Sequence, residues 1–455
     1  MSRSARISLS LLAAMAAGTV ALAAAFWLGR GSAASGETLT LYVSGDTRGY
    51  LEPCGCRRDQ AGGLPGRMTL VRQYQGDRLL VDVGSLTSGD RPHEILKLEY
   101  LLRGMQLMGY DAVNLGGREA GLDRDTLRGI LQSSQAPFVS CNVLDRSTGR
   151  PLAPAHRIVR AAGVQIGITG VVHVEDDAAG PGILVRPPAE ALAEVLPRLR
   201  SQCDYVLVLA WADGEALNAL ASRFHEIDCL LGGDVPQSSE RAERINRAVA
   251  FNVTEKGKVL GKLRFARTSQ GLELAESRAV RVVDTIPPAP EMLALLKEYR
   301  AVLRDRNIEL AASEGLEPIS AASTTSDTYA GEASCAPCHS GAHQAGVLAR
   351  HAHAYETLVR KGAEYDPDCL RCHTVGYGAR DGFVNLERTP HLASVQCENC
   401  HGRGGDHARA MRAGARRASS FRPVTPNTCI RCHDEENDGD FSYPRDWAKI
   451  RHGAG

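Results

Sequence analysis

One short motif occurs four times between residues 335 and 433, and this repetition constrains the fold more than any other feature. The copies are C-A-P-C-H at 335–339, C-L-R-C-H at 369–373, C-E-N-C-H at 397–401 and C-I-R-C-H at 429–433. C-x-x-C-H is the attachment signature of a c-type haem. Structural zinc sites also use cysteine pairs, but they do not require a histidine after every second cysteine. The repetition therefore predicts four covalent haems, attached through Cys335, Cys338, Cys369, Cys372, Cys397, Cys400, Cys429 and Cys432, with His339, His373, His401 and His433 as proximal iron ligands.

Length and composition divide the chain into a body and a haem module. A chain of 455 residues is too long for a single core and predicts two or three domains. Residues 330–455 hold eight of the 13 cysteines and ten of the 14 histidines. Basic and acidic residues number 53 each, so no basic excess indicates nucleic-acid binding. We predict an N-terminal segment (1–36), an α/β body (37–285), a linker (286–329) and a mainly helical, loop-rich haem module (330–455).

The N-terminal segment predicts export. Arg3 and Arg6 precede a mostly apolar run over residues 7–28, which is followed by Arg30 and a stretch of small residues. This is the arrangement of a secretory signal, and the run is also just long enough to span a bilayer. We expect either a cleaved signal or a retained membrane anchor, with the protein in the periplasm or on the outer face of the inner membrane.

The body alternates strand-like and helical patterns. Apolar strand-like runs occupy residues 38–44, 79–83, 110–114, 137–142, 164–172 and 205–210, and helical periodicity occurs at 94–108 and 188–200. This alternation is typical of a sheet with helices on its faces. Three further strand-like segments, 248–253, 259–266 and 276–283, are expected to close the domain in antiparallel fashion.

The linker combines a helical stripe with a flexible composition. Its apolar residues recur at helical spacing, at Met292, Leu295, Leu296, Tyr299, Leu303 and Ile308. Residues 320–327 are rich in serine and threonine, which is typical of a loop. We expect the helix to pack on one domain and the loop to set the haem module apart.

The body resembles the metallophosphoesterase domain of 5′-nucleotidases. The resemblance rests on LYVSGDTRGYLE, GGLPGRMTLV, LLVDVGS, MGYDAVNLGGRE, PFVSCNVLD, IGITGVV, DYVLVLAWADGE and IDCLLGGD, in that order. It implies a four-layer αββα fold, in which loops at the strand ends hold two divalent metals.

Carried over residue by residue, most of that metal site is missing. Asp46 matches the first aspartate of the family pattern, and Glu119 remains from the third ligand block. Other expected ligand positions are occupied by Arg48, Ser85, Gly117, Arg118, Trp211, Gly233 and Val235. Two-metal phosphoryl transfer needs several ligands to clamp the metals, so we expect the fold without the hydrolysis. The arginines are consistent with either a small anionic ligand or solvated surface positions.

Three cysteines of the body form a possible thiol site. Cys54 and Cys56 flank a glycine in the first loop, and the resemblance brings Cys141 toward the same pocket. A structural disulfide would suit an oxidising compartment. A thiol–disulfide switch and a thiol-bound metal are the alternatives.

The haem module resembles tetrahaem cytochromes of the c-554 type. The resemblance is carried by the four motifs, HAHAYETL from His351, SVQCENCHGRGGDH ending at His407, and WAKIRHG containing His452. It implies distal iron ligands at His351 or His353, at His407 and at His452, with His391 as a further candidate and His343 at the surface. Bis-histidine iron serves electron transfer, whereas a five-coordinate iron can bind a small molecule.

Together these patterns predict an exported multihaem cytochrome that exchanges electrons with redox partner proteins. The nucleotidase-like domain is expected to bind or to act as a scaffold. One alternative is an enzyme, with an open haem iron or residual phosphoesterase activity. The other is a redox sensor that uses Cys54 and Cys56.

The repeated motif makes a direct prediction about mass. Expressed with the c-type maturation machinery, each chain should gain the mass of four haems, because each motif supplies one pair of thiols. Intact-mass spectrometry measures this gain. A gain of two haems or fewer would contradict the motif assignment.

Overall fold

The computed structural model describes residues 38–53, 60–175, 177–313, 327–347, 349–415, 421 and 423–452. The predicted export segment, Cys54, Cys56 and nearly all of the serine- and threonine-rich stretch lie outside these ranges. Within them, no helix is both long and apolar enough to cross a membrane.

The body is built on two six-stranded sheets. The first has the order β14-β13-β1-β2-β3-β4 and the second β11-β12-β10-β9-β7-β6. The first comprises β1 (Thr38–Ser44), β2 (Arg78–Asp82), β3 (Ala112–Asn114), β4 (Phe138–Val139), β13 (Val259–Thr268) and β14 (Gly271–Arg281). The second comprises β6 (His156–Ala161), β7 (Val164–Val172), β9 (Tyr205–Trp211), β10 (Cys229–Gly233), β11 (Glu243–Ile245) and β12 (Ala248–Asn252), while β5 (Val143–Asp145) and β8 (Ile183–Val185) form a small separate pair.

The central strands are parallel and buried on both faces. β1 pairs in parallel with β2, β2 with β3 and β3 with β4, and β9 pairs in parallel with both β7 and β10. Six of the seven β1 residues and all seven β9 residues are buried. Continuous apolar strands need cover on both sides, which explains why the sequence shows short apolar runs and not strict alternation.

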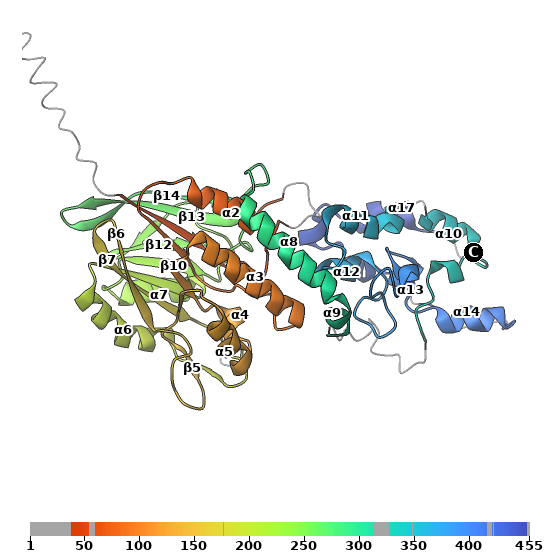
Figure 1. The fold of residues 1–455 in the computed structure, drawn as a ribbon, viewed down its shortest axis with the longest axis horizontal. Coiled ribbons are helices and arrows are strands. Elements are labelled where there is room, and N and C mark those ends of the chain that lie inside the picture. The colour runs from red at the N-terminus through yellow and green to blue at the C-terminus, as the bar shows by residue number, and fades with distance from the viewer. Residues whose placement is uncertain are drawn as a thin grey trace, which may run out of the picture.

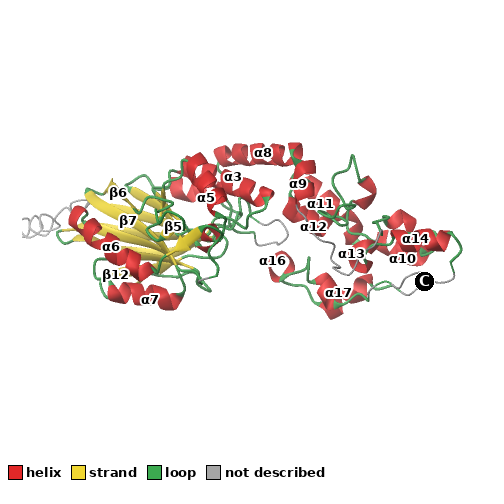
Figure 2. Ribbon diagram, turned by 90° about the horizontal axis from the view of Figure 1, so that it is seen from below, coloured by secondary structure: helices red, strands yellow, loops and turns green. Residues whose placement is uncertain are grey.

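Helices cover the outer faces of the two sheets (Figure 2). On one side are α2 (Leu64–Arg72), α3 (Pro92–Met108) and α8 (Pro290–Asp305), which share the main core with both sheets. On the other side, α6 (Pro188–Gln202) and α7 (Gly214–Arg223) pack on the second sheet through a separate apolar cluster. The short α4 (Gly117–Ala120) and α5 (Arg124–Ser133) follow β3. The predicted four-layer αββα fold is confirmed.

The closing strands differ from the expectation. β12 pairs in parallel with β10 in the second sheet, whereas β13 and β14 are antiparallel and join the first sheet beside β1. The chain therefore crosses between sheets after β12, and strand patterns alone do not specify that crossing. The linker helix α8 buries Met292, Leu295, Leu296, Tyr299 and Leu303 against the body, but Ile308 of the predicted stripe is 42 % exposed.

The C-terminal module is a chain of short helices with a small apolar core. Its helical segments are η1 (Glu332–Ser334), α10 (Ser340–Val347), η2 (Arg350–His353), α11 (Ala354–Lys361), α12 (Pro367–His373), η3 (Pro390–Leu392), α13 (Cys397–His401), α14 (Gly405–Arg412), α15 (Pro426–Cys429), α16 (Glu435–Asp438) and α17 (Tyr443–Ile450). Its core gathers Tyr355, Leu358, Leu370, Val375, Tyr377, Phe383 and Leu392 with Ala311 of α9 (Asn307–Ser313). This apolar core is small for the length of the module.

The module docks on the body beyond the end of α8 (Figure 1), although we expected it to be set apart. Lys97 of α3 contacts Asp366 at 3.3 Å and Asp368 at 2.5 Å, and His93 Nε2 lies 3.1 Å from Asp368. Burial alone would lower the pKa of Lys97, but the two carboxylates raise it well above its ordinary value. Asp368 directly precedes Cys369, so this contact fixes the second haem motif against the body.

Removing the Lys97 charge should weaken docking. Lys97→Met removes the ammonium group that pairs with both Asp366 and Asp368. We expect a loss of about 2 kcal/mol in apparent free energy of unfolding, less than for a fully buried pair because Asp368 is partly exposed. Denaturant unfolding followed by circular dichroism measures it.

A matched control lies on the same helix. Arg103 makes an exposed pair with Glu298, and exposed pairs contribute about 0.5 kcal/mol. Arg103→Met should therefore cost much less than Lys97→Met. Equal losses would show that Lys97 has no special role in docking.

Candidate functional site

Three residues where the resemblance places the metal site have left-handed backbone. Asp46, Arg48 and Ser85 all have positive φ angles, of 52°, 47° and 64°. Such angles are uncommon for residues other than glycine and cluster at functional sites. The Asp46 carboxylate accepts hydrogen bonds from Arg48 Nε at 2.5 Å and from Thr254 Oγ1 at 3.0 Å. A guanidinium thus occupies the space beside the one aspartate that matches the family pattern.

Glu119 has a structural contact pattern. Its carboxylate accepts backbone hydrogen bonds from Ser85, Leu86, Thr87 and Gly116, at 2.7–2.9 Å. Burial raises the pKa of Glu119, against the lowering effect of those four donors. Both carboxylate oxygens hold the loop after β2 and are not aimed at a metal.

Trp211 fills the space where ligand side chains would project. A β-carbon added at Gly117 would lie 2.9 Å from Trp211 Nε1, and one added at Gly233 would lie 2.6 Å from Trp211 Cε3. These distances leave no room for side chains at either glycine. Trp211 is itself buried. Its indole therefore fills, by apolar packing, the space beside these two glycines.

A small cavity of about 330 Å³ remains beside Asp46. Its charged lining is mostly cationic, and is contributed by Asp46, Arg48, Glu255, Lys256, Lys258 and Arg281. Arg118, the other predicted arginine, donates to the backbone oxygen of Ser88 at 2.7 Å and does not line this cavity.

Cys141 lies away from that cavity. It packs in the apolar cluster between the second sheet and α6, and burial raises its pKa to about 11. A thiol with this pKa stays protonated at neutral pH, which disfavours metal binding and thiol exchange. The other two members of the possible thiol site, Cys54 and Cys56, lie outside the described residues.

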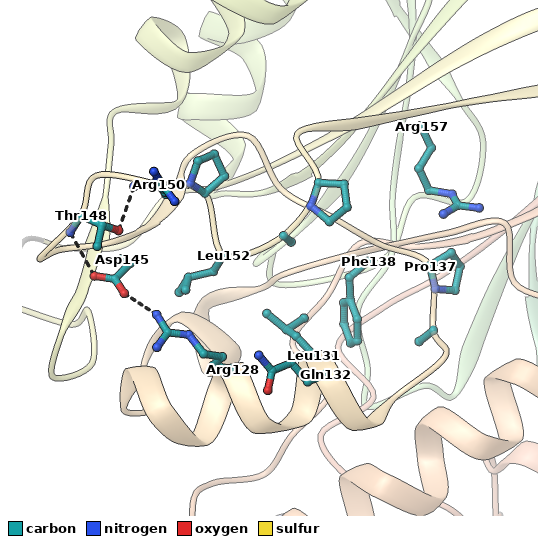
Figure 3. Close-up of a pocket in the computed structure, with 14 residues that line it drawn as sticks. Arg128, Leu131, Gln132, Pro137, Phe138, Asp145, Thr148, Arg150, Leu152 and Arg157 are labelled. Carbon is teal, nitrogen blue, oxygen red and sulfur yellow. Dashed lines mark hydrogen bonds and ion pairs between the residues drawn. The ribbon is translucent and has the colours of Figure 1, made fainter.

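A larger cavity of about 530 Å³ contains none of the residues predicted from the sequence. It lies between α5 and the segment from Asp145 to Arg157 (Figure 3). Arg128 pairs with Asp145 at its wall, and Thr148 accepts from the backbone nitrogen of Arg150 at 3.3 Å. Its charges are thus partly neutralised within the protein.

In the C-terminal module, three of the four motif histidines face a second histidine. The ring centres are 6.2 Å apart for His339 and His407, 5.9 Å for His433 and His351, and 5.8 Å for His401 and His452. An imidazole nitrogen bonds a metal at about 2 Å and the ring centre lies about 1 Å further on. Two rings on opposite sides of an iron therefore have centres about 6 Å apart. The three pairs fit axial haem ligation.

His373 is the exception among the motif histidines. Its Nδ1 lies 2.8 Å from the backbone oxygen of Ala354 and 3.3 Å from Thr357 Oγ1. Among the described residues, no histidine ring is stacked opposite it. The structure therefore offers this motif a proximal ligand and no paired distal histidine.

The remaining candidate histidines are placed elsewhere. His353 is exposed, with Nδ1 3.2 Å from Glu356, so His351 is the one of the two that meets a motif histidine. His391 is exposed, and its backbone oxygen accepts from Gln396. His343 is partly buried on α10.

The four attachment motifs are neighbours in space. The Cys335 thiol hydrogen-bonds that of Cys397, and the Cys372 thiol hydrogen-bonds that of Cys432. Cys400 lies near Cys429. The first motif therefore adjoins the third, the third adjoins the fourth, and the fourth adjoins the second.

Comparisons with known proteins divide the chain in the same way. The family model described as "Cytochrome c554 and c-prime" matches residues 334–402. Cytochrome c-554 of Nitrosomonas europaea is 32 % identical over 104 residues, which is 19 % of this chain and 44 % of the relative. The C-terminal part is thus similar to a multihaem c-type cytochrome, which implies iron-containing c-type haem.

The N-terminal part matches a different group. The 5′-nucleotidase of Vibrio cholerae is 28 % identical over 161 residues, covering 32 % of this chain and 29 % of that protein. The 5′-nucleotidase precursor of Thermus thermophilus superposes with a TM-score of 0.51 at 22 % identity over 59 % of each chain. The sulfate thiohydrolase SoxB of the same organism gives 0.51 at 20 % over 62 % of each.

These comparisons confirm both resemblances stated from the sequence. The chain combines a 5′-nucleotidase-like domain with a cytochrome c-554-like module, and it spans less than half the length of either curated relative.

Several residues that join the body to the C-terminal module were not predicted from the sequence. Tyr50 and Lys256 of the body contact Glu436 of the module, and Asp438 contacts His433. The acidic run directly after the fourth motif was a signal for such contacts. Its partners, however, are distant in sequence.

The paired histidines predict a change of spin state. His452→Ala removes the ring opposite His401, so one low-spin iron should become high-spin. Electron paramagnetic resonance of the oxidised full chain measures it. His353→Ala is the matched control and should leave the spectrum unchanged; the reverse result would show that the pairs are misassigned.

Proposed function

We propose that this chain is an exported electron-transfer cytochrome whose module carries four c-type haems. The observation that supports this most strongly is the spacing of three histidine pairs, each wide enough for one iron. Haem iron held by two histidines has no open position and exchanges single electrons. The protein's part is to hold the axial rings, and burial, together with the facing ring, lowers the pKa of His351 and His401, which favours the neutral form that a metal ligand needs.

The contacts between motifs favour transfer along the module. Attachment sites in contact leave little protein between neighbouring cofactors, in the order first, third, fourth, second. The body covers the end that carries the second and fourth motifs, which leaves the end with the first and third motifs open to redox partners.

The open end has a surface suited to an acidic partner protein. Helix α14 carries exposed Arg409 and Arg412 close to His407 in sequence, and the ring of Phe421 packs against that histidine in a tilted arrangement, with ring centres 4.7 Å apart. Asp406 neutralises Arg409 in part. Basic residues beside a cofactor steer acidic partners and raise the rate of encounter.

We propose that the body does not hydrolyse phosphate esters. Arg48 is paired with Asp46, Trp211 fills the positions beside Gly117 and Gly233, and Glu119 is used by backbone donors. The remaining cationic cavity suits a small anion better than two divalent metals. A scaffolding role agrees with its docking contacts.

One observation favours a second activity at the second motif. His373 has no paired histidine among the described residues, and an iron with one open position can bind a small molecule. A multihaem oxidoreductase is therefore the second candidate. The thiol-sensor alternative gains no support from the placement of Cys141.

Two measurements on the same full-length preparation test the proposal. Reductive titration should take up four electrons per chain reversibly. With Mn²⁺ or Mg²⁺ present, cleavage of nucleotides and simple phosphate esters should stay at background. Turnover that disappears in Asp46→Ala would contradict the non-hydrolytic assignment, and irreversible or sub-stoichiometric reduction would contradict electron transfer.

A further inference from the structure

Helix α16 connects the fourth haem motif to the nucleotidase-like domain. It spans only Glu435–Asp438 and begins two residues after His433. Two of its carboxylates make contacts in different directions. Asp438 Oδ2 lies 2.7 Å from His433 Nδ1, and Glu436 contacts Tyr50 and Lys256 of the body.

The Asp438 contact acts on the proximal ligand. If Nε2 of His433 binds the haem iron, Nδ1 would carry the proton and would donate a hydrogen bond to the Asp438 carboxylate. A carboxylate partner raises the basicity of a metal-bound imidazole, which stabilises ferric over ferrous iron. At the second motif, His373 Nδ1 meets the neutral backbone oxygen of Ala354 at 2.8 Å. This difference in hydrogen-bond partner favours a lower reduction potential for the haem of the fourth motif than for the haem of the second.

The Glu436 contact holds the helix in place. Glu436 accepts from the Tyr50 hydroxyl at 2.5 Å and pairs with Lys256 Nζ. Burial would raise the pKa of Glu436, but hydrogen bonds from Lys256 and Tyr50 lower it below its ordinary value. The carboxylate therefore stays ionised and anchored at neutral pH.

Lys256, which pairs with Glu436, lies on a tight turn of the body. Glu255, Lys256 and Gly257 have φ angles of 75°, 55° and 70°. Beneath them the fully buried Arg67 donates to the backbone oxygen of Gly257 at 3.3 Å and to Thr47 Oγ1 at 3.3 Å. Strained backbone persists only where its surroundings over-determine it. The turn thus presents Lys256 at a fixed position.

We propose that Asp438 is a positioning residue that lowers the reduction potential of the haem at His433, and that Tyr50 and Lys256 hold α16 so that this hydrogen bond is maintained. The inference rests on the proposed electron-transfer function. It gives the nucleotidase-like domain a specific role, which is to set the reduction potential of the haem at His433.

The first test changes the hydrogen bond alone. Asp438→Asn keeps the side-chain shape but replaces the carboxylate by a neutral amide. The equilibrium constant for reduction of one haem should rise about tenfold, which is an upward shift of about 59 mV for one electron. Spectroelectrochemical titration of the full chain measures this shift. The reduction potentials of the other three haems, which appear as separate components of the titration curve, should stay unchanged.

The second test changes the anchor. Lys256→Met removes a positive charge, and Coulomb's law alone predicts that reduction becomes harder. If Lys256 holds α16 in place, its loss weakens the hydrogen bond between Asp438 and His433. The reduction potential of the haem at His433 should then shift upward, as it does in Asp438→Asn. Tyr50→Phe removes only a hydroxyl and should shift that component upward by a smaller amount.

A double variant and a matched control complete the design. In the Asp438→Asn background, Lys256→Met should add no further upward shift, because the hydrogen bond is already lost. Lys262→Met removes the same charge from β13, where Lys262 lies over the rings of Tyr42 and Tyr74, and should leave all four components unchanged. Haem content and circular dichroism confirm folding of each variant.

The outcomes separate this inference from the proposed function. If the unmodified protein shows no reversible reduction, the electron-transfer proposal fails. If reduction is reversible but Asp438→Asn shifts no component, or Lys256→Met shifts one downward or not at all, the role of α16 is overturned.

Discussion

The spacing between facing histidine rings is the constraint on which the C-terminal module depends. Three pairs of rings stand 5.8–6.2 Å apart, although their members come from segments as distant in sequence as His339 and His407. The apolar core of the module is small, so apolar packing alone gives little reason for these segments to meet. Under the proposed function, covalent haems between the rings would complete this core, and the polypeptide would supply their axial ligands together with the contacts that dock the module on the body.

The nucleotidase-like domain combines the fold of its relatives with side chains that do not match the metal-ligand pattern of the resemblance. The loops that end β1 and β2 have left-handed backbone at Asp46, Arg48 and Ser85, while Trp211 and Arg48 occupy the space where the resemblance would place metal ligands. Fold and function are separable in this way because the scaffold is stabilised by its layers, and not by the site. At the edge of the domain, Lys97 pairs with Asp368 and Lys256 pairs with Glu436. These two carboxylates lie beside the second and fourth haem motifs.

The sequence predicted the parts of this structure that depend on local pattern. The four motifs, most strands of the two sheets and the loss of the metal ligands could be read directly, and the ring contacts of His407 and His452 agree with their predicted role as distal ligands. The choice between His351 and His353 could not be made, because both lie on one turn and only its orientation selects the ring that faces His433. Counting spare histidines likewise gave no sign that His373 would lack a paired ring. The docking contacts were missed because His93 and Lys97 meet Asp368 across some 270 positions of sequence, and no local pattern encodes such a pairing.

The spin states of the irons in the unmodified protein report directly on how many irons have two histidine ligands. Electron paramagnetic resonance of the fully oxidised chain, with the signals integrated against the haem content, counts low-spin and high-spin irons. Three facing histidine pairs and one unpaired motif histidine predict three low-spin irons and one high-spin iron per chain. Two or more high-spin irons would contradict the pairing of the rings, and four low-spin irons would contradict the open position at His373.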